Sequence, residues 1–320
     1  MGAVNAGRRV VLALLSDGEV LHYNSIMRSR RGSTIVFACM MVCVLALEAH
    51  PQQPAPAASG ARILLLPRRI VSGERATLAV LDVNGRLTPG VTVNFSNGDR
   101  FTTDATGRAL FVAPLNPGVI FGSIAGRTGR VATAILSPSE ASSPTLEVSS
   151  VPKVASLTDR FEIFGKGFCG DADANQVTIA GQPAIVLAAS PTALVVLPPP
   201  ELQPGNAAVE VSCAKRQSPP FSLTFVGLEL EADSSPLKPG EHRALTVRVR
   251  GTSAKIAFEA RNLAPEIAEL SEGNPVRAST SGGGENLAKF EVLGRKNGSF
   301  LISIRLVSPA RRPLPVNLPH

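Results

Sequence analysis

The stretch FEIFGKGFCGDADANQVTIAG, residues 161–181, combines a strand, a glycine-rich turn and a second strand in one short unit. Phe161 and Ile163 provide apolar side chains for a core, and Val177 and Ile179 alternate with polar residues as in a half-buried strand. The glycines between these strands let the chain turn where a Cβ atom would clash. The stretch therefore predicts one half of a small β-sandwich.

The surrounding sequence makes this unit recognisable. Pro152 lies upstream, and the run GQPAIVLAASPTALVVLPPP follows directly at residues 181–200. With these flanks, about residues 145–226 closely resemble the IPT/TIG family of immunoglobulin-like β-sandwiches. Members of that family serve as modules in cell-surface receptors, transcription factors and bacterial secreted proteins. The resemblance thus implies a sandwich and leaves the ligand open.

Composition predicts the same fold class for the rest of the chain, which has 320 residues with 28 Gly, 26 Pro, no Trp and a single Tyr. Short strands joined by many turns have this composition, and long helices are not expected. We expect an all-β chain of tandem immunoglobulin-like β-sandwiches after an N-terminal signal segment. The expected order is a leader and signal peptide at 1–49, a Pro/Ala-rich linker at 50–60, a bacterial Ig-like sandwich at 61–137, a linker at 138–145, the IPT/TIG-like sandwich at 146–226, a further Ig-like sandwich at 227–308 and a disordered tail at 309–320.

The first of these sandwiches is expected to be a strand meander. Asn84-Gly85 and Asn97-Gly98 are typical tight hairpin turns between alternating apolar and polar residues. The segment TTDATGRALF bends at Asp104 and Gly107. It is similar to the corresponding turn of bacterial Ig-like domains of the invasin and intimin type, which implies the fold and no binding residue.

The last sandwich begins without a linker after the strand predicted at residues 221–226, so it should form a stiff pair with its predecessor. A final hairpin is predicted at residues 296–299. Residues 262–286 are expected to form a long polar connection containing three consecutive glycines. Because a strand and not a helix follows these glycines, we interpret them as a flexible loop and not as a phosphate cradle.

The N-terminal region has the layout of a secretory signal peptide. Arg28, Arg30 and Arg31 precede an uncharged apolar run at residues 34–47, which is followed by small residues and a proline-rich segment. The run is about fourteen residues long, short of the roughly 20 that span a bilayer, so no stable transmembrane span is expected after cleavage near residue 49. Two interpretations of the start remain open: translation begins at Met27, or residues 1–26 are a genuine extension before a signal anchor.

Cysteine usage points to one disulfide. Cys39 and Cys43 lie inside the apolar run without a lipoprotein pattern, so the exported part retains only Cys169 and Cys213. In an oxidising compartment such a pair within one sandwich should be joined. In the chain-entropy model its loop of about 45 residues stabilises the fold by roughly 3 to 5 kcal/mol.

No metal, cofactor or catalytic constellation stands out. The histidines are scattered, without the spacing of a zinc site, and His242 lies in a turn-like segment with no nucleophile motif near it. Glu229 and Glu231 share a strand face, but a glycosidase cleft also needs aromatic sugar platforms. The segment from Asp171 to Asn175 starts like a calcium loop, yet it lacks the required glycine and the final acid, so we expect a polar turn.

Charge adds little, because the chain carries a formal net charge of +7 that falls to +5 without the first 49 residues (27 basic minus 22 acidic). Nucleic-acid binding would require a basic stripe with stacking aromatics, so it is not expected. The sequence predicts a secreted, periplasmic or cell-surface, non-catalytic binding or spacer protein of a bacterium without cofactors, with an unknown protein or glycan partner at the envelope. A carbohydrate-binding accessory protein is the alternative, and a hydrolase with an unrecognised site is the third.

Overall fold

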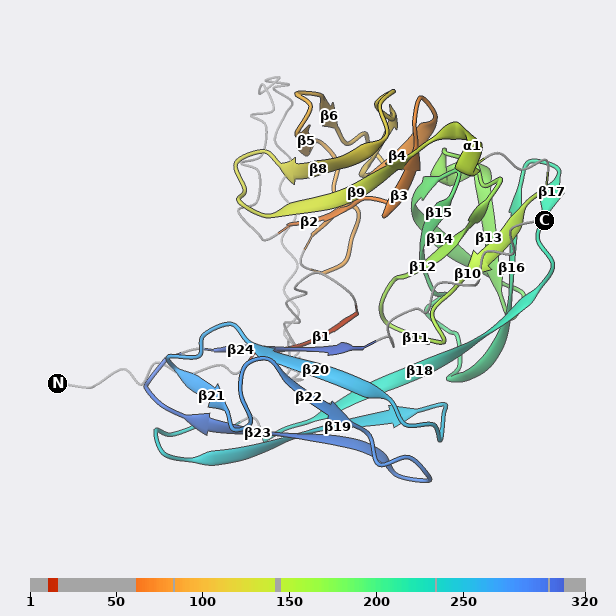
Figure 1. Cartoon of the computed structure of the whole chain (residues 1–320). Helices are drawn as coiled ribbons and strands as arrows, with labels where there is room; N and C mark the ends of the chain where they lie inside the picture. The colour runs from red at the N-terminus through yellow and green to blue at the C-terminus, as the bar shows by residue number, and fades with distance from the viewer. Residues whose placement is uncertain are drawn as a thin grey trace, which may run out of the picture.

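The computed structural model describes residues 11–16, 62–82, 84–141, 145–233, 235–298 and 300–307. The predicted linker at 50–60, the tail at 309–320 and all of the predicted leader except residues 11–16 lie outside this part. The fold is all-β, as predicted: tandem immunoglobulin-like sandwiches account for nearly every described residue. Figure 1 shows the three sandwiches in an arc, with the second at the bend and the first and third at its two ends.

The first sandwich packs a three-stranded sheet against a five-stranded sheet. The turns predicted at residues 84–85 and 97–98 are confirmed, since Gly85 and Gly98 both have a positive φ and close tight turns. Three phenylalanines, Phe95, Phe101 and Phe111, pack ring against ring at 5.2–5.5 Å in its core. Its two sheets are β2 (Arg62–Leu65), β4 (Arg75–Asp82) and β7 (Arg108–Val112), and β3 (Arg69–Val71), β9 (Arg130–Leu136), β8 (Gly118–Ile124), β5 (Thr92–Phe95) and β6 (Arg100–Thr102).

The second sandwich follows a short helix, α1 (Pro138–Ala141). The strand, turn and strand predicted at residues 161–181 are present, and a single turn of 3-10 helix, η1 (Ala172–Ala174), lies between the two strands. The strands are β10 (Glu147–Ser150), β12 (Phe161–Lys166), β15 (Ala193–Leu197), β14 (Gln182–Ser190), β13 (Asn175–Ile179), β16 (Gly205–Cys213), β17 (Arg216–Gln217), β11 (Val154–Ser156) and β18 (Phe221–Glu231).

The third sandwich shares a strand with the second. The first half of β18 pairs with β16, and its second half pairs with β19 (His242–Arg250). No break separates the two halves, so the second and third sandwiches are joined by one continuous strand, in line with the predicted lack of a linker. The other strands are β20 (Ala257–Asn262), β21 (Ala268–Leu270), β22 (Val276–Ser279), β23 (Asn286–Gly294) and β24 (Leu301–Leu306).

Two predictions for the third sandwich are wrong. Residues 262–286 are not merely a polar connection, because β21 and β22 lie within them and bury Ala268, Leu270 and Val276 in the core. Residues 296–299 do not close a hairpin, because β23 and β24 pair with different partners and belong to opposite sheets. The turn there carries the chain from one sheet to the other.

One more strand of the third sandwich comes from the N-terminal end of the sequence. Residues 11–16, which fall in the predicted leader, form β1 (Val11–Ser16) and pair in parallel with β24. This adds a fourth strand to the sheet β24-β20-β22. In Figure 1, β1 lies beside β24 at the edge of the third sandwich.

Candidate functional site at the junction of the first two sandwiches

The most elaborate polar and apolar contacts between sandwiches lie where the first meets the second, a region that we call the first junction. It has its own apolar cluster, separate from the cores, made of Ile63, Leu65, Ala79, Leu81, Leu187, Ala188 and Val195. The cluster joins β2 and β4 to β14 and β15, and one β-bridge links Ala189 to Thr77 across the boundary. Removing this much apolar surface from water opposes separation of the two sandwiches.

Strand β4 explains why the junction forms. Residues 76–81 are buried without interruption, because one face of β4 covers the core of its own sandwich and the other covers the second sandwich. Their sequence, ATLAVL, is correspondingly apolar at every position except Thr77. Sequence reasoning treated this strand as half-buried and missed the junction. The signal that could have found it is the presence of apolar residues on both faces of the strand, at 76, 78 and 80 and at 79 and 81, which is typical of strands covered on both faces.

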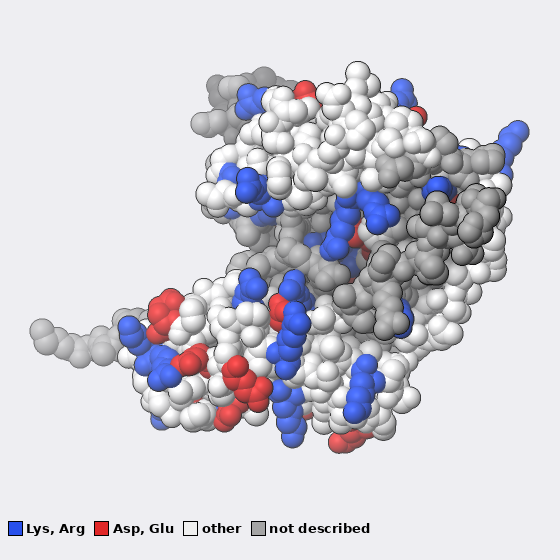
Figure 2. Space-filling model, viewed as in Figure 1, with Lys and Arg blue, Asp and Glu red and all other residues white. Residues whose placement is uncertain are grey.

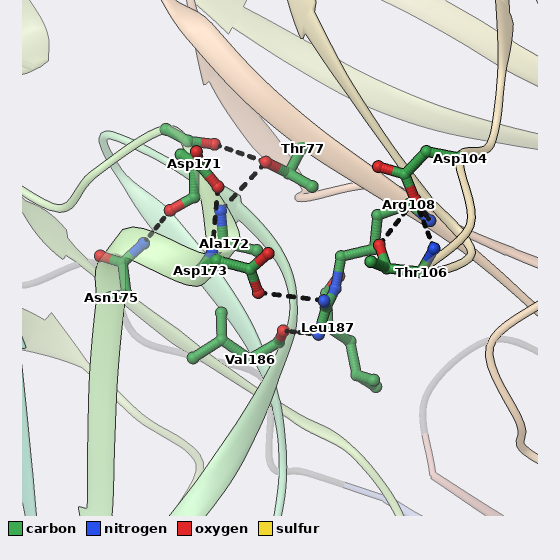
Figure 3. Close-up of polar contacts among 11 residues, drawn as sticks. Thr77, Asp104, Thr106, Arg108, Asp171, Ala172, Asp173, Asn175, Val186 and Leu187 are labelled. Carbon is green, nitrogen blue, oxygen red and sulfur yellow. Dashed lines mark hydrogen bonds and ion pairs between the residues drawn. The ribbon is translucent and has the colours of Figure 1, made fainter.

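Arg108 is the main polar link across the first junction (Figure 3). Its guanidinium donates to the carbonyl oxygens of Val186 at 2.8 Å and Leu187 at 3.2 Å, and it pairs with Asp173 at 3.0 Å. The register between β14 and β15 shifts at this point, between Val186 and Ala188. An irregularity of this kind leaves backbone groups without ladder partners. Arg108 thus donates to two backbone carbonyls at this irregularity.

Thr77 makes the second polar link. Its hydroxyl donates to the carbonyl oxygen of Gly170 at 2.8 Å and accepts from the N–H of Ala172 at 3.1 Å. Gly170 lies so close to β4 that an added Cβ would collide with the carbonyl oxygen of Arg75. The loop at residues 170–175 of the second sandwich therefore docks directly on β4 of the first.

The carboxylates of this loop are engaged by the protein itself. Asp171 accepts the N–H of Asp173 and caps η1, while Asp173 pairs with Arg108 (Figure 3). Asn175 donates to the carbonyl oxygens of Asp171 and Cys169 at 2.7 and 2.9 Å. Within the part of the chain that the structure describes, no three His, Cys, Asp or Glu side chains are arranged to hold a metal ion. The loop acts as a docking turn between the two sandwiches.

The two candidate cysteines lie at the base of the same loop. Cys169 and Cys213 are joined in a disulfide with their Cα atoms 5.8 Å apart and 44 residues apart in sequence. Cys213 also pairs in register with Asn175. The side-chain oxygen Oδ1 of Asn175 accepts a hydrogen bond from the backbone N–H of Cys169 at 2.9 Å. The disulfide and Asn175 together tether the docking loop to β16.

The other residues considered for chemistry are dispersed. His242 contacts Glu291 at 3.0 Å on an exposed strand face. Glu229 and Glu231 pair with Arg250 and Arg248 across β18 and β19, which forms a partly exposed ladder of charges on that face. Figure 2 shows acidic and basic side chains interspersed over the third sandwich.

One charged cluster in the third sandwich is more enclosed. Glu259 is only 4% exposed and contacts both Arg277 and Arg305, from the two strands that flank β20. Burial alone would raise the pKa of Glu259, but the hydrogen bonds from Arg277 and Arg305 outweigh it, so the pKa lies below the usual glutamate value. Both arginines therefore pair with the ionised carboxylate of Glu259, which is not available as a free acid or base.

Aromatic side chains give no platform for sugar stacking among the described residues. Every phenylalanine there is buried or half-buried, and the half-buried Phe121 is covered by Arg130, whose guanidinium lies 4.7 Å from the ring centre. The single tyrosine, Tyr23, lies outside the described residues. Among the helices of the described segments, none combines the length and apolar character needed to cross a bilayer.

Comparisons with known proteins identify no family. No family model matches the chain, and neither does any curated protein. Among solved structures, the chain is similar to SGBP-B of the Bacteroides ovatus mixed-linkage glucan utilization locus in complex with a mixed-linkage heptasaccharide, at 13% identity and a TM-score of 0.28, over 76% of this chain and 74% of that one. It is also similar to domains 4 and 5 of the S-layer protein SbsC, at 23% identity and a TM-score of 0.20, over 36% of this chain and 63% of that one.

A third similarity is to the extracellular region of Plexin A4, at 11% identity and a TM-score of 0.27, over 78% of this chain and 22% of that one. The chain spans about three quarters of SGBP-B and less than two thirds of the other two structures. At these identities and TM-scores we take no function from the comparisons.

Proposed function

We propose that this chain is a secreted or envelope-associated, non-catalytic binding or spacer protein of a bacterium, which acts through the surfaces of its Ig-like sandwiches. The observation that carries the proposal is the pair of junctions. The first junction is closed by an apolar cluster, Arg108 and Thr77, and the second is the continuous strand β18. Such junctions set fixed distances between exposed loops, which a spacer or a multi-site binder needs.

The second junction is also sterically tight. Gly251 has a φ of +93°, and a Cβ there would lie 2.7–2.8 Å from Pro204, Gly205 and the carbonyl oxygen of Phe225. The backbone after β19 therefore packs directly on the second sandwich. Together with β18, this contact opposes bending between the second and third sandwiches.

The proposed location rests on the sequence. The arginines after Met27 and the apolar run at residues 34–47 favour export, and the disulfide between Cys169 and Cys213 favours an oxidising compartment. We further propose that the second sandwich belongs to the IPT/TIG family, on the strength of the motif at residues 161–181. Proteins that combine export with such modules present them outside the cytoplasm.

The non-catalytic part of the proposal is supported by the state of the candidate groups. His242, Glu229 and Glu231 are each engaged in an ion pair or hydrogen bond on an open sheet face. Their side chains are 45–55% exposed, whereas acid–base catalysis by shifted carboxylates relies on enclosure from water. The carbohydrate-binding alternative lacks an exposed aromatic side chain in the described part of the chain.

Two experiments test this function. Residues 27–60 fused to a reporter that is active only outside the cytoplasm should give a signal, and the same fusion with Leu45→Arg in the apolar run should give none. No reporter activity from either fusion, with both fusion proteins retained in the cytoplasm, would contradict export.

The exported protein should then be used as bait for envelope fractions, on a glycan array and in a hydrolase screen. We expect the bait to retain an envelope protein. Retention should be weaker for the Gly170→Ala bait, whose first junction cannot close. It should be unchanged for the Gly129→Ala bait, where an added Cβ meets no atom within 4 Å. Glycan signals at comparable concentrations would favour the carbohydrate-binding alternative, and turnover of any substrate would overturn the non-catalytic assignment.

A further inference from the structure

The first two sandwiches each close one sheet edge with a short parallel strand. In the first, β3 pairs in parallel with the last strand, β9, and in the second, β11 pairs in parallel with β18. Both short strands follow only a few residues after the opening strand of their sandwich, β2 or β10. The backbone groups on the outer edge of β9 and β18 are thereby paired.

Among its described residues, the third sandwich has no such strand of its own. After Glu231 the chain runs to Leu237 in the core, and Gly240 then donates its N–H to the carbonyl oxygen of Gly294 at the end of β23. The described residues between β18 and β19 form no strand beside β24. The position that β3 and β11 occupy in the other sandwiches is filled by β1, which pairs in parallel with β24 over six residues, from Val11 with Leu301 to Ser16 with Leu306. The third sandwich is thus completed by a strand from outside its own sequence.

Register defines which backbone groups this outside strand meets. Leu263 donates to the carbonyl oxygen of Leu301 and Val307 donates to that of Ala257, so the odd-numbered residues of β24 bond to β20. In a ladder the two edges alternate, so Ile302, Ile304 and Leu306 direct their N–H and C=O groups to the opposite edge. Without β1 these groups would form an open edge, which is a template for an added strand.

We propose that this edge of β24 is an acceptor site for a donated strand: an extended, apolar segment of a partner polypeptide, free of proline, pairs in parallel with β24 in the place that Val11–Ser16 holds in the full chain. The segment VLALLS defines the chemistry of the occupant, since six consecutive residues without charge or proline fit this edge in parallel. The proposal rests on the proposed export, because removal of residues 1–49, or a start at Met27, eliminates β1 and exposes the edge.

The test compares two sets of residues in β1, those whose N–H groups point to β24 and those whose N–H groups point away from it. The register directs the N–H groups of Ala13 and Leu15 to the carbonyl oxygens of Ile302 and Ile304, whereas the N–H groups of Leu12 and Leu14 point away. A full chain with Ala13→Pro and Leu15→Pro should lose its own β1. A matched full chain with Leu12→Pro and Leu14→Pro should keep it, because proline is tolerated where an edge strand makes no ladder bond.

Hydrogen exchange at the amides of Ile302, Ile304 and Leu306 provides the readout. Protection should fall at least about tenfold in the Ala13/Leu15 variant, stay near wild type in the Leu12/Leu14 variant, and return when a synthetic peptide of residues 9–18 is added to the former. The same peptide N-methylated at Ala13 and Leu15 should not restore it. Wild type should not bind the peptide, because its edge is occupied.

Three results would overturn the proposal. Unchanged protection in the Ala13/Leu15 variant would mean that β1 does not cover β24, and failure of the peptide to bind that variant would mean that the edge accepts no strand in trans. Protection retained because the variant dimerises would assign the edge to a second copy. Unchanged amide protection in the first two sandwiches serves as the folding control. None of these outcomes depends on export, so the inference can fail while the reporter fusion succeeds, and the reverse.

Discussion

At the scale of single residues, Arg108 shows how one side chain holds two sandwiches together. It reaches from β7 to backbone carbonyls of β14, and its side chain is only 12% exposed. Charged donors satisfy carbonyls better than neutral ones, and removing a partner leaves a buried acceptor unsatisfied. Its third contact, Asp173, is 71% exposed and should matter less.

We therefore expect Arg108→Ala to lower the free energy of unfolding by about 1–3 kcal/mol, because two carbonyls lose their donor at the first junction. Asp173→Ala should cost less than about 1 kcal/mol, since exposed ion pairs contribute little. Urea unfolding of both variants measures the difference. Equal losses in the two variants would mean that the ion pair, and not the carbonyl contacts, dominates.

Glu259 gives a pH-dependent prediction. Because the pKa of Glu259 is lowered on folding, its ionised form stabilises the folded state above the unfolded pKa, near 4.5, and this contribution is lost as the pH falls through the lower folded value. Glu259→Gln should cost about 1–2 kcal/mol at pH 7, less than for a fully buried pair because Arg277 is largely exposed. At pH 3 the loss should be smaller. Glu272→Gln, at an exposed turn, is the control, and a loss independent of pH would contradict the account.

At the scale of elements, the disulfide between Cys169 and Cys213 connects the docking loop to β16. The double Cys→Ala variant should lose about 2 to 5 kcal/mol of stability from the second sandwich, because the closed loop no longer restricts the unfolded chain. Calorimetry of the exported protein measures this, together with mass spectrometry of a non-reduced digest. Two free thiols in that digest would show that the bond does not form in the native protein.

The second junction can be tested through its glycines. Gly251 and Gly240 both have a positive φ, but only Gly251 has neighbours within 3 Å of an added Cβ, whereas Gly240 has none within 4 Å. Both alanine variants carry the backbone cost, about 1 kcal/mol, and Gly251→Ala should add a steric cost of roughly 1–3 kcal/mol. Thermal unfolding measures both. Equal melting temperatures would mean that the two sandwiches do not pack tightly at Gly251.

Elements differ in how far the sequence predicts them. Asn84-Gly85 and Asn97-Gly98 could be predicted because a tight turn needs a positive φ that glycine supplies locally. The short strands β21 and β22 were missed, because Ala268, Leu270 and Val276 are isolated among polar residues and gain their strand structure by pairing with β23 and β20. Pairing of that kind depends on partners distant in sequence.

At the scale of the whole molecule, the fold class was accessible from sequence and the arrangement of the sandwiches was not. Composition, turn residues and the motif at residues 161–181 predict β-sandwiches. The first junction joins Arg108 to Asp173 and Thr77 to Gly170, pairs that are 65 and 93 residues apart, and no local pattern encodes them. Only the mainly apolar residues 76–81 of β4 indicate that this strand is covered on both faces.

We expect the two junctions to hold the three sandwiches as one body. Spin labels at Ala105→Cys in the first sandwich and Glu272→Cys in the third, both exposed, report the distance between the ends of the arc by pulsed electron paramagnetic resonance. We expect one narrow distance distribution, which should broaden with Gly170→Ala and not with Gly129→Ala. A broad distribution in the otherwise unaltered protein would contradict it, because freely jointed sandwiches would then sample many separations.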